Sequence, residues 1–222
     1  MRKINRIYIW MSIACCLLVT LAGCINLTKE YPDIKKYTLN VEREAAPAPN
    51  AGAVNLKVMR FDIASEYESI YFTYKTGDLT IEYDFYNRFA IDPATMITEQ
   101  VIKWAGHSPF VRYVESKRSI IMPEYAVKGD IIRLYADLGD EGNAKAVLEI
   151  RFVILDNRAF PPHIIFQNVY SEEIMLRTMT IMKLVEGWNT ALRNILVDFE
   201  ADLTTFLKSS AKKSETKKNT EG

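Results

Sequence analysis

The chain has 222 residues, of which 49% are apolar and 25% are charged, a composition typical of a globular domain with a hydrophobic core. Lys and Arg together number 28 and Asp and Glu together number 28, so the formal net charge is zero. A dedicated nucleic-acid-binding protein needs clustered positive charge to displace counterions from phosphates, so this balance argues against that class.

The start of the chain differs from the rest. Residues 1–6 (MRKINR) contain three basic residues and no acid, and residues 7–22 carry no charge. A basic start, a short apolar stretch and small residues at its end are typical of a secretory signal peptide. A transmembrane anchor is the alternative, but it needs about 20 apolar residues, and the apolar run here is shorter and is followed at once by LTKEYPDIKK. The sequence therefore predicts a lipoprotein signal peptide over residues 1–23.

All three cysteines, Cys15, Cys16 and Cys24, lie in or next to this segment. Cys24 ends the tetrapeptide LAGC, which resembles the bacterial lipobox, where a cysteine receives a diacylglyceryl group before cleavage. Cys24 is thus the expected lipid-attachment site, and Cys15 and Cys16 leave with the signal peptide. The mature chain then has no free thiol, which suits an oxidising compartment. Metal or redox chemistry is disfavoured because Cys15 and Cys16 lack ligand spacing and histidine partners.

Residues 24–35 form the predicted lipidated N-terminus and tether. Fully extended, residues 25–35 reach roughly 36–40 Å at ~3.3–3.6 Å each, so we expect the folded domain to lie close to its membrane. Removal of residues 1–23 takes three basic residues and no acid, which lowers the net charge to about −3. Because Ile25 rather than Asp follows the cysteine, we expect the periplasmic face of the outer membrane rather than the inner membrane.

A single domain is predicted over residues 36–207, and its first half contains strands. The expected strands and turns are 36–41, a loop at 44–53, 55–61, 69–74, a turn at 75–78, and 79–86. In the last of these, Leu79, Ile81, Tyr83 and Phe85 face one way and Thr80, Glu82, Asp84 and Tyr86 the other. This period-two alternation predicts a hairpin strand with one buried, apolar face.

The second half of the domain contains two helices and a long hairpin. Asp92 and Pro93 are suited to the start of a helix that ends near Gly106, and a strand follows at 110–114. Strands 130–138 and 144–155 flank the turn GDEGN, and a further strand covers 163–170. A long amphipathic helix is predicted over 171–208, with Ser171 at its N-terminus, Trp188 on its apolar stripe and a close contact at Gly187.

The order of elements predicts an α+β fold with a largely antiparallel sheet. Each helix has one apolar stripe, and the simplest way to bury both is against one face of the sheet. Residues 208–222 contain no large apolar residue and are predicted to be a disordered basic tail. In the strand 144–155, the side chains of Ala146, Leu148, Ile150, Phe152 and Ile154 form the expected core face. Its edge or its second face, with Val147, Val153 and Leu155, is a candidate surface for self-association or docking.

Signs of enzymatic chemistry are few. His107 and His163 lie beside proline-containing turns and are interpreted as turn residues, and Ser108 and Ser119 lack a nucleophile signature. No glycine-rich phosphate loop occurs. We therefore expect no catalytic residue, no cofactor and no metal site.

Two residue groups admit a functional interpretation beside a structural one. A carboxylate cluster near the first hairpin could supply an acid and a base, but a solvated strand face is favoured: Glu66, Glu68, Asp78, Glu82 and Asp84. A methionine stripe on the long helix could be an adaptable contact surface, but core filling is favoured: Met175, Met179 and Met182. The tail lysines could touch anionic lipid, or simply keep the chain soluble.

The order of motifs resembles the ABC-type transport auxiliary lipoproteins, the family that includes the PqiC-like proteins. The resemblance covers nearly the whole mature chain. It rests on the lipobox cysteine, Tyr37-Thr38-Leu39, Tyr83-Asp84-Phe85-Tyr86, Arg88-Phe89-Ala90 with Pro93, Tyr125-Ala126-Val127-Lys128-Gly129-Asp130, and the terminal helix with Trp188, Leu192 and Leu203. Phe89 departs from the Trp that the family more usually has. The resemblance implies a fold like the N-terminal domain of TolB.

The resemblance also implies a role. Such proteins serve ABC transporters that work with mammalian-cell-entry (MCE) domain proteins to move lipids or other hydrophobic molecules between the two bacterial membranes. The expected partners are the membrane, through lipidated Cys24, an MCE-domain periplasmic protein and further copies of the chain. Two alternatives stay open: a free-standing lipoprotein that binds a hydrophobic ligand between sheet and helices, and an envelope enzyme. A carrier should contain an apolar cavity of several hundred Å³, whereas a docking module should have a filled core and an exposed surface.

Overall fold

The computed structural model describes residues 33–43, 54–115, 123–139 and 142–220, with side chains up to Phe206. The predicted signal peptide, Cys24 and most of the tether lie outside the described residues, as does Ser119. The chain divides into two compact units, residues 1–33 and 34–222, and the fold below is that of the second.

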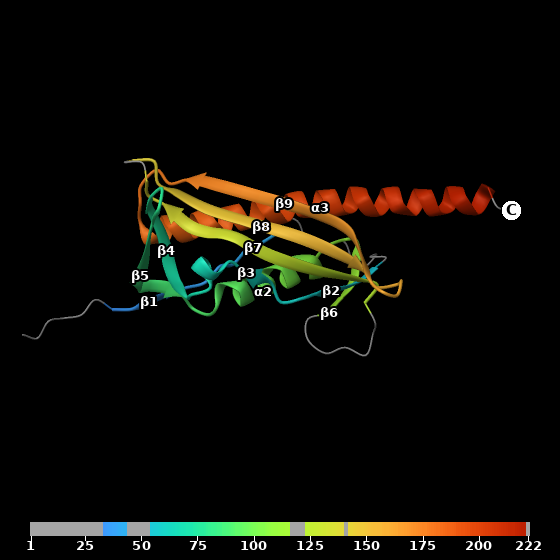
Figure 1. Ribbon diagram of the computed structural model, residues 1–222, viewed down its shortest axis with the longest axis horizontal. Coiled ribbons are helices and arrows are strands. Elements are labelled where there is room, and N and C mark those ends of the chain that lie inside the picture. The colour runs from blue at the N-terminus through green and yellow to red at the C-terminus, as the bar shows by residue number, and fades with distance from the viewer. Residues whose placement is uncertain (1–32, 44–53, 116–122, 140–141, 221–222) are drawn as a thin grey trace, which may run out of the picture. The chain divides into compact units, whose positions relative to one another are not determined.

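The described residues form strands and two α-helices, which confirms the predicted α+β class (Figure 1). A short 3-10 helix, η1, covers Ser65–Tyr67. The strands are β1 (Lys35–Tyr37), β2 (Val54–Val58), β3 (Asp62–Ile63), β4 (Tyr71–Gly77), β5 (Thr80–Phe89), β6 (Val111–Glu115), β7 (Tyr125–Asp137), β8 (Lys145–Asp156) and β9 (His163–Met175). The helices are α2 (Pro93–Gly106) and α3 (Ile181–Thr220).

Strand β7 organises the sheet. One of its edges pairs along its length with β8, which pairs in turn with β9, and both ladders are antiparallel. The other edge is shared by three short parallel partners, β2, β3 and β4. Beyond them, β6 pairs with β2, β5 pairs with β4, and β1 pairs with β5. The sheet is therefore mixed, with antiparallel long ladders, as predicted, and parallel short ones.

The β7–β8 hairpin has the core face that its alternation predicts. Ile150 and Phe152 are fully buried, and two apolar side chains of the opposite face are buried as well, since Val147 is 1% exposed and Val153 8%. The prediction that β8 offers an edge for pairing is wrong, because β7 and β9 occupy both of its edges.

The prediction for β5 is wrong about which face is buried. Register with β4 places Asp84 opposite Phe72, and Phe72 is fully buried. Tyr83 lies opposite Thr73 and Ile81 opposite Lys75, so both turn to the other side of the sheet, away from the helices. A register irregularity between Tyr71 and Phe72 then shifts the phase of the strand, which returns Phe89 to the core.

The long helix begins ten residues later than predicted. Residues 171–175 extend β9, and their ladder with β8 ends where Lys145 pairs with Met175. An ion pair of 3.1 Å between Lys145 Nζ and Glu173 Oε2 joins the two strands. The cap is Thr180 instead of Ser171, because the backbone N–H of Lys183 donates to Thr180 Oγ1 at 3.2 Å.

Helix α3 also extends further than predicted. It continues to Thr220, so the segment from residue 208, predicted to be a disordered basic tail, is helical up to that residue.

Both helices pack on one hydrophobic core. Asp92 caps α2 as predicted, accepting the backbone N–H of Thr95 at 2.8 Å. On α3, Trp188 is fully buried against the rings of Phe72 and Phe89, at centroid distances of 5.0 and 5.4 Å. The close contact expected at Gly187 is confirmed, since an added Cβ would lie 2.7 Å from the Cβ of Ala146.

Candidate functional site

The outward face of β5 and the turn before it carry exposed apolar side chains, here called the β5 strip: Leu79, Ile81, Tyr83 and Phe85. Leu79 is 99% exposed, and the other three are 40%, 54% and 55% exposed. The two rings are held in place, because Tyr83 Oη donates to the carbonyl of Glu66 at 3.2 Å and Phe85 stacks on Tyr71 at 5.9 Å. A neighbouring group of exposed apolar residues that is held in fixed positions is typical of an interaction surface.

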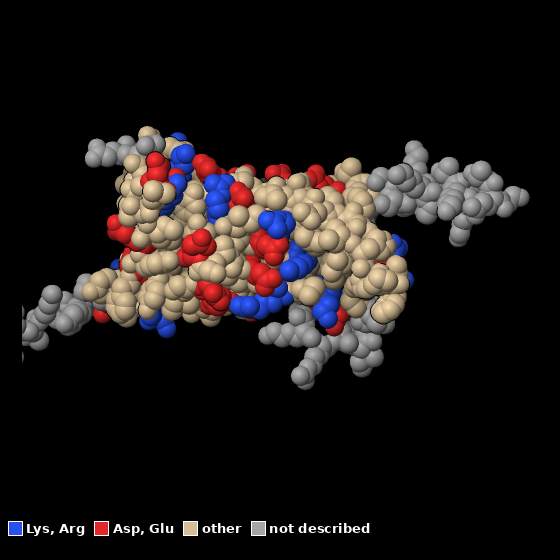
Figure 2. Space-filling view, viewed as in Figure 1, with Lys and Arg blue, Asp and Glu red and all other residues tan. Residues whose placement is uncertain are grey.

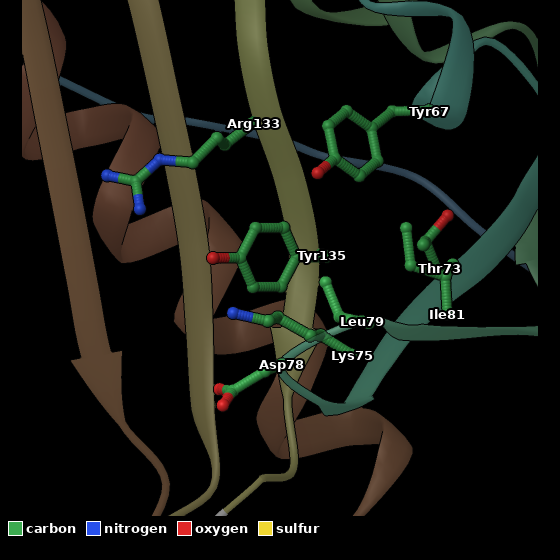
Figure 3. Close-up of a pocket in the computed structure, with 8 residues that line it drawn as sticks. All are labelled: Tyr67, Thr73, Lys75, Asp78, Leu79, Ile81, Arg133 and Tyr135. Atoms are coloured by element: carbon green, nitrogen blue, oxygen red, sulfur yellow. The ribbon is translucent and has the colours of Figure 1, made fainter.

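A pocket of about 260 Å³ lies at the Leu79 end of the β5 strip (Figure 3). Its lining comes from η1, the β4–β5 hairpin and β7: Tyr67, Thr73, Lys75, Asp78, Leu79, Ile81, Arg133 and Tyr135. The rings of Tyr67 and Tyr135 stack at a centroid distance of 5.8 Å. The hydroxyl of Thr73 is buried and has no hydrogen-bond partner among the described residues. The pocket therefore combines aromatic walls with an unsatisfied polar group.

Of the charged groups around the pocket, Arg133 has hydrogen-bond partners on neighbouring strands. Figure 3 shows the guanidinium of Arg133 turned away from the two tyrosine rings, and it donates to Glu149 Oε2 and to Ser171 Oγ. Lys75 and Asp78 come from the β4–β5 hairpin and lie together at one side of the pocket. Burial and the nearby Tyr135 raise the pKa of Tyr67, so its phenol stays protonated at neutral pH. The pocket lining therefore offers hydrogen-bond donors, among them the protonated Tyr67 hydroxyl.

The outer face of β7, β8 and β9 is mixed, with exposed Val169 and Met175 on β9 beside a network of charged side chains. Cations and carboxylates alternate across it in ion pairs, including Lys128–Asp62 at 3.2 Å and Arg151–Asp130 at 3.7 Å. Figure 2 shows acidic and basic side chains interleaved on this face. The apolar residues exposed on β9 are therefore interspersed with ion pairs, whereas the β5 strip brings four exposed apolar side chains together.

His107 and Ser108 have structural partners. The backbone N–H of His107 donates to Trp104 O at the end of α2, and its Nδ1 lies 2.7 Å from Lys103 O. His163 is exposed at the start of β9. Ser108 Oγ donates to Glu200 Oε1 at 2.6 Å, which links the end of α2 to α3.

The structure does not gather the predicted carboxylate cluster into an acid–base pair. Asp78 lines the pocket, whereas Asp84 faces the other side of the hairpin and accepts the Tyr74 hydroxyl at 2.7 Å. Burial acts to raise the pKa of Asp84, but hydrogen bonds from Tyr74, Asn87 and the backbone outweigh it and lower that pKa. Within the residues that the structure describes, no cluster of three or more His, Cys, Asp or Glu side chains could hold a metal ion.

The methionine stripe is not a feature of one helix. Met175 lies on β9 and is 53% exposed, Met179 precedes α3 and packs against the core, and Met182 is 58% exposed on α3. Core filling is therefore right for Met179 alone. A second hollow of about 290 Å³ lies where β9 ends and α3 begins, with Met175 and Gly187 in its lining.

Sequence reasoning missed most of the pocket, notably Tyr67, Thr73, Lys75, Arg133 and Tyr135. These residues come from separate segments that only the sheet brings together, and no spacing in the sequence unites them. Among the described residues, no helix combines the length and the apolar character that crossing a membrane requires.

Comparison with known proteins gives structural neighbours only. No family model and no curated protein matches the chain. A crystal structure of a Xanthomonas campestris protein of the DUF330 family has a TM-score of 0.67, with 13% identity over 80% of this chain and 99% of that one. A second crystal structure, of an uncharacterized protein, has a TM-score of 0.61, with 8% identity over 77% and 99% of the two chains. At these identities the likeness concerns the fold, and the chain therefore has the α+β fold of that DUF330 protein.

Proposed function

We propose that the protein is a non-enzymatic, membrane-anchored lipoprotein component of an MCE-type ABC transport system that moves lipids or other hydrophobic molecules across the bacterial envelope. The observation that carries this proposal is a filled core combined with an exposed apolar strip. Large side chains fill the space between sheet and helices, each of them less than 2% exposed: Trp188, Phe61, Phe72 and Phe152. A domain that acts through surface contacts, with a membrane or with a protein, has a filled core and keeps apolar side chains on its outside, whereas a carrier needs interior space.

The proposed anchor is lipidated Cys24, on the periplasmic face of the outer membrane. The lipobox LAGC at the end of the apolar run supports it. Several acyl chains anchor a protein stably, while one alone binds only marginally. The proposed partners are an MCE-domain periplasmic protein and further copies of the chain.

A second candidate function is the free-standing lipoprotein that binds a hydrophobic ligand. The 260 Å³ pocket favours it, because Leu79 and Ile81 supply apolar lining. The pocket lies on the outer side of the sheet, however, rather than between sheet and helices, and it is partly polar.

The anchor is tested by Cys24→Ala in the full chain. We expect loss of acylation and retention of residues 1–23, measured by mass spectrometry of the membrane fraction. Cys15→Ala is the matched control, since Cys15 leaves with the signal peptide and its loss should change nothing. An unmodified Cys24 in the mature wild-type protein would contradict the proposal, and density-gradient separation of the membranes tests the outer-membrane location.

The partner is tested by chemical crosslinking in envelope membranes followed by purification and mass spectrometry. We expect an MCE-domain protein among the crosslinked species, at a level that falls when Cys24→Ala releases the domain from its membrane. Recovery of a bound lipid with no MCE-domain protein would instead favour the ligand-binding candidate.

A further inference from the structure

The β5 strip lies next to the point where the chain enters the domain. Strand β1 pairs in parallel with the end of β5, with Lys35 opposite Asn87 and Tyr37 opposite Phe89. The residues that lead back to Cys24 therefore leave the domain beside β5. The described chain begins there with exposed residues, Asp33 and Ile34 among them.

The length of the tether keeps this strand close to the lipid. Residues 25–34 span at most about 33–36 Å at ~3.3–3.6 Å per residue. Strand β5 has ten residues and is about 33 Å long at ~3.3 Å per residue. The point where the chain enters the domain, beside Asn87, therefore lies within about 36 Å of the membrane that holds Cys24, a distance close to the length of β5 itself.

The composition of this side matches a lipid interface. Tyr83, Phe85 and Tyr86 are exposed on β5, and aromatic side chains favour the boundary between headgroups and acyl chains. Lys35 and Lys36 are exposed at the chain entry, where they can meet anionic headgroups. The outer face of β7, β8 and β9 also exposes Val169 and Met175, but it lies farther from the chain entry and its apolar residues are separated by ion pairs.

We propose that the β5 strip is the surface through which the domain lies on the membrane that holds Cys24, with Leu79, Ile81, Tyr83 and Phe85 in the headgroup region. This inference rests on the proposed acylation of Cys24. It assigns the strip to a lipid surface and leaves the rest of the outer face for protein partners.

The test uses full-length acylated protein in vesicles of phosphatidylethanolamine and phosphatidylglycerol. Because Cys24 is blocked by its lipid, Tyr83→Cys introduces the single free thiol of the mature chain, which is labelled with an environment-sensitive fluorophore. Tyr113→Cys is the matched control, since Tyr113 is 45% exposed on β6, at the opposite end of the strand order. Lipids that carry a spin label should quench the probe at position 83 several-fold more than the probe at position 113.

Equal quenching at the two positions would overturn the inference. A blue shift at position 83 that grows with protein concentration without vesicles would also overturn it, because a second copy would then cover the strip. Flotation of the same samples separates the two proposals. Protein that fails to float contradicts the acylation and both proposals, whereas protein that floats with an unquenched position 83 contradicts only the membrane contact.

Discussion

The two hairpins of the sheet carry the same alternating pattern but meet different surroundings. In β7–β8, Ile150 on the core face is fully buried, and Val147 on the other face is 1% exposed. In β4–β5, Phe85 belongs to an equally regular alternation and is 55% exposed. The pattern is therefore evidence for a strand with an apolar face, but not for burial of that face.

The neighbours of each strand explain the difference. Strand β8 lies between β7 and β9, and α3 covers its core face, where Phe152 stacks on Phe199 at a centroid distance of 4.1 Å. Strand β5 lies between β4 and the three-residue β1. Its register with β4 turns Asp84 toward the core side and the apolar residues outward. Which face meets the core is decided by pairing across the sheet, and alternation within one strand cannot reveal it.

The largest expected effect is at Trp188, whose ring packs on both Phe72 of β4 and Phe89 of β5. Trp188→Ala should lower the free energy of unfolding by about 3–5 kcal/mol, because it opens a cavity in the core. Domains are typically stable by roughly 5–15 kcal/mol, so this variant should be marginal. Urea denaturation measures the loss, with Met182→Ala on the exposed side of α3 as control. An unchanged midpoint would mean that α3 is not packed on the sheet.

A matched pair of phenylalanines tests the comparison of the hairpins directly. Phe152→Ala in β8 should cost about 3–5 kcal/mol, while Phe85→Ala in β5 should cost about 1 kcal/mol or less, since Phe85 is already 55% exposed. Thermal unfolding of the two variants gives the ordering. Similar losses would show that the β5 strip is covered in solution.

A smaller effect is expected where helix and sheet approach closely. An added Cβ at Gly187 would lie 2.7 Å from Ala146 Cβ and 3.0 Å from Leu176 Cδ2, so Gly187→Ala forces the helix away from β8. Overpacking costs about 1–3 kcal/mol, part of which is offset by the better helix propensity of Ala, and we expect a net loss of about 1 kcal/mol. Gly106→Ala is the control, with no atom within 4 Å of its added Cβ, and it should not destabilise the domain.

The smallest expected effect depends on pH and concerns the charge of Asp84 in the β4–β5 hairpin. The pKa of Asp84 is lowered in the fold, so its ionised form stabilises the native state above the unfolded pKa of about 3.9. That stabilisation is lost as the pH falls below about 4 and through the folded pKa. The difference in unfolding free energy between wild type and Asp84→Asn should therefore shrink between pH 6 and pH 3. A constant difference would show that Asp84 contributes nothing through its charge.

Local signals predicted the elements whose own residues determine them. The hairpin around GDEGN, the cap at Asp92 and the burial of Trp188 all follow from the spacing within one segment. These features, and the α+β class that they imply, could be predicted from the sequence.

Features that depend on pairing between distant segments were not predictable. Ser171, Glu172 and Glu173 suit a helix start as well as a strand, and the ladder with β8 decides for the strand. The pocket between Tyr67 and Tyr135 likewise exists only because β7 brings η1 and the β4–β5 hairpin together. The outward orientation of the β5 strip depends on a register irregularity between Tyr71 and Phe72, and no residue type in the sequence predicts that irregularity.

The shared edge of β7 has a consequence for the order of folding. The meander of β7, β8 and β9 pairs strands that are neighbours in the chain. The pairs of β7 with β2 and with β4 join distant residues, such as Leu56 with Tyr125 and Tyr74 with Ala136. Closing such loops costs entropy before any contact forms, so sequence-distant parallel pairs form slowly. During synthesis β2, β3 and β4 are made before β7, the strand with which they pair. We therefore expect the C-terminal meander and the local β4–β5 hairpin to form before the hairpin docks on β7 through its sequence-distant parallel pair.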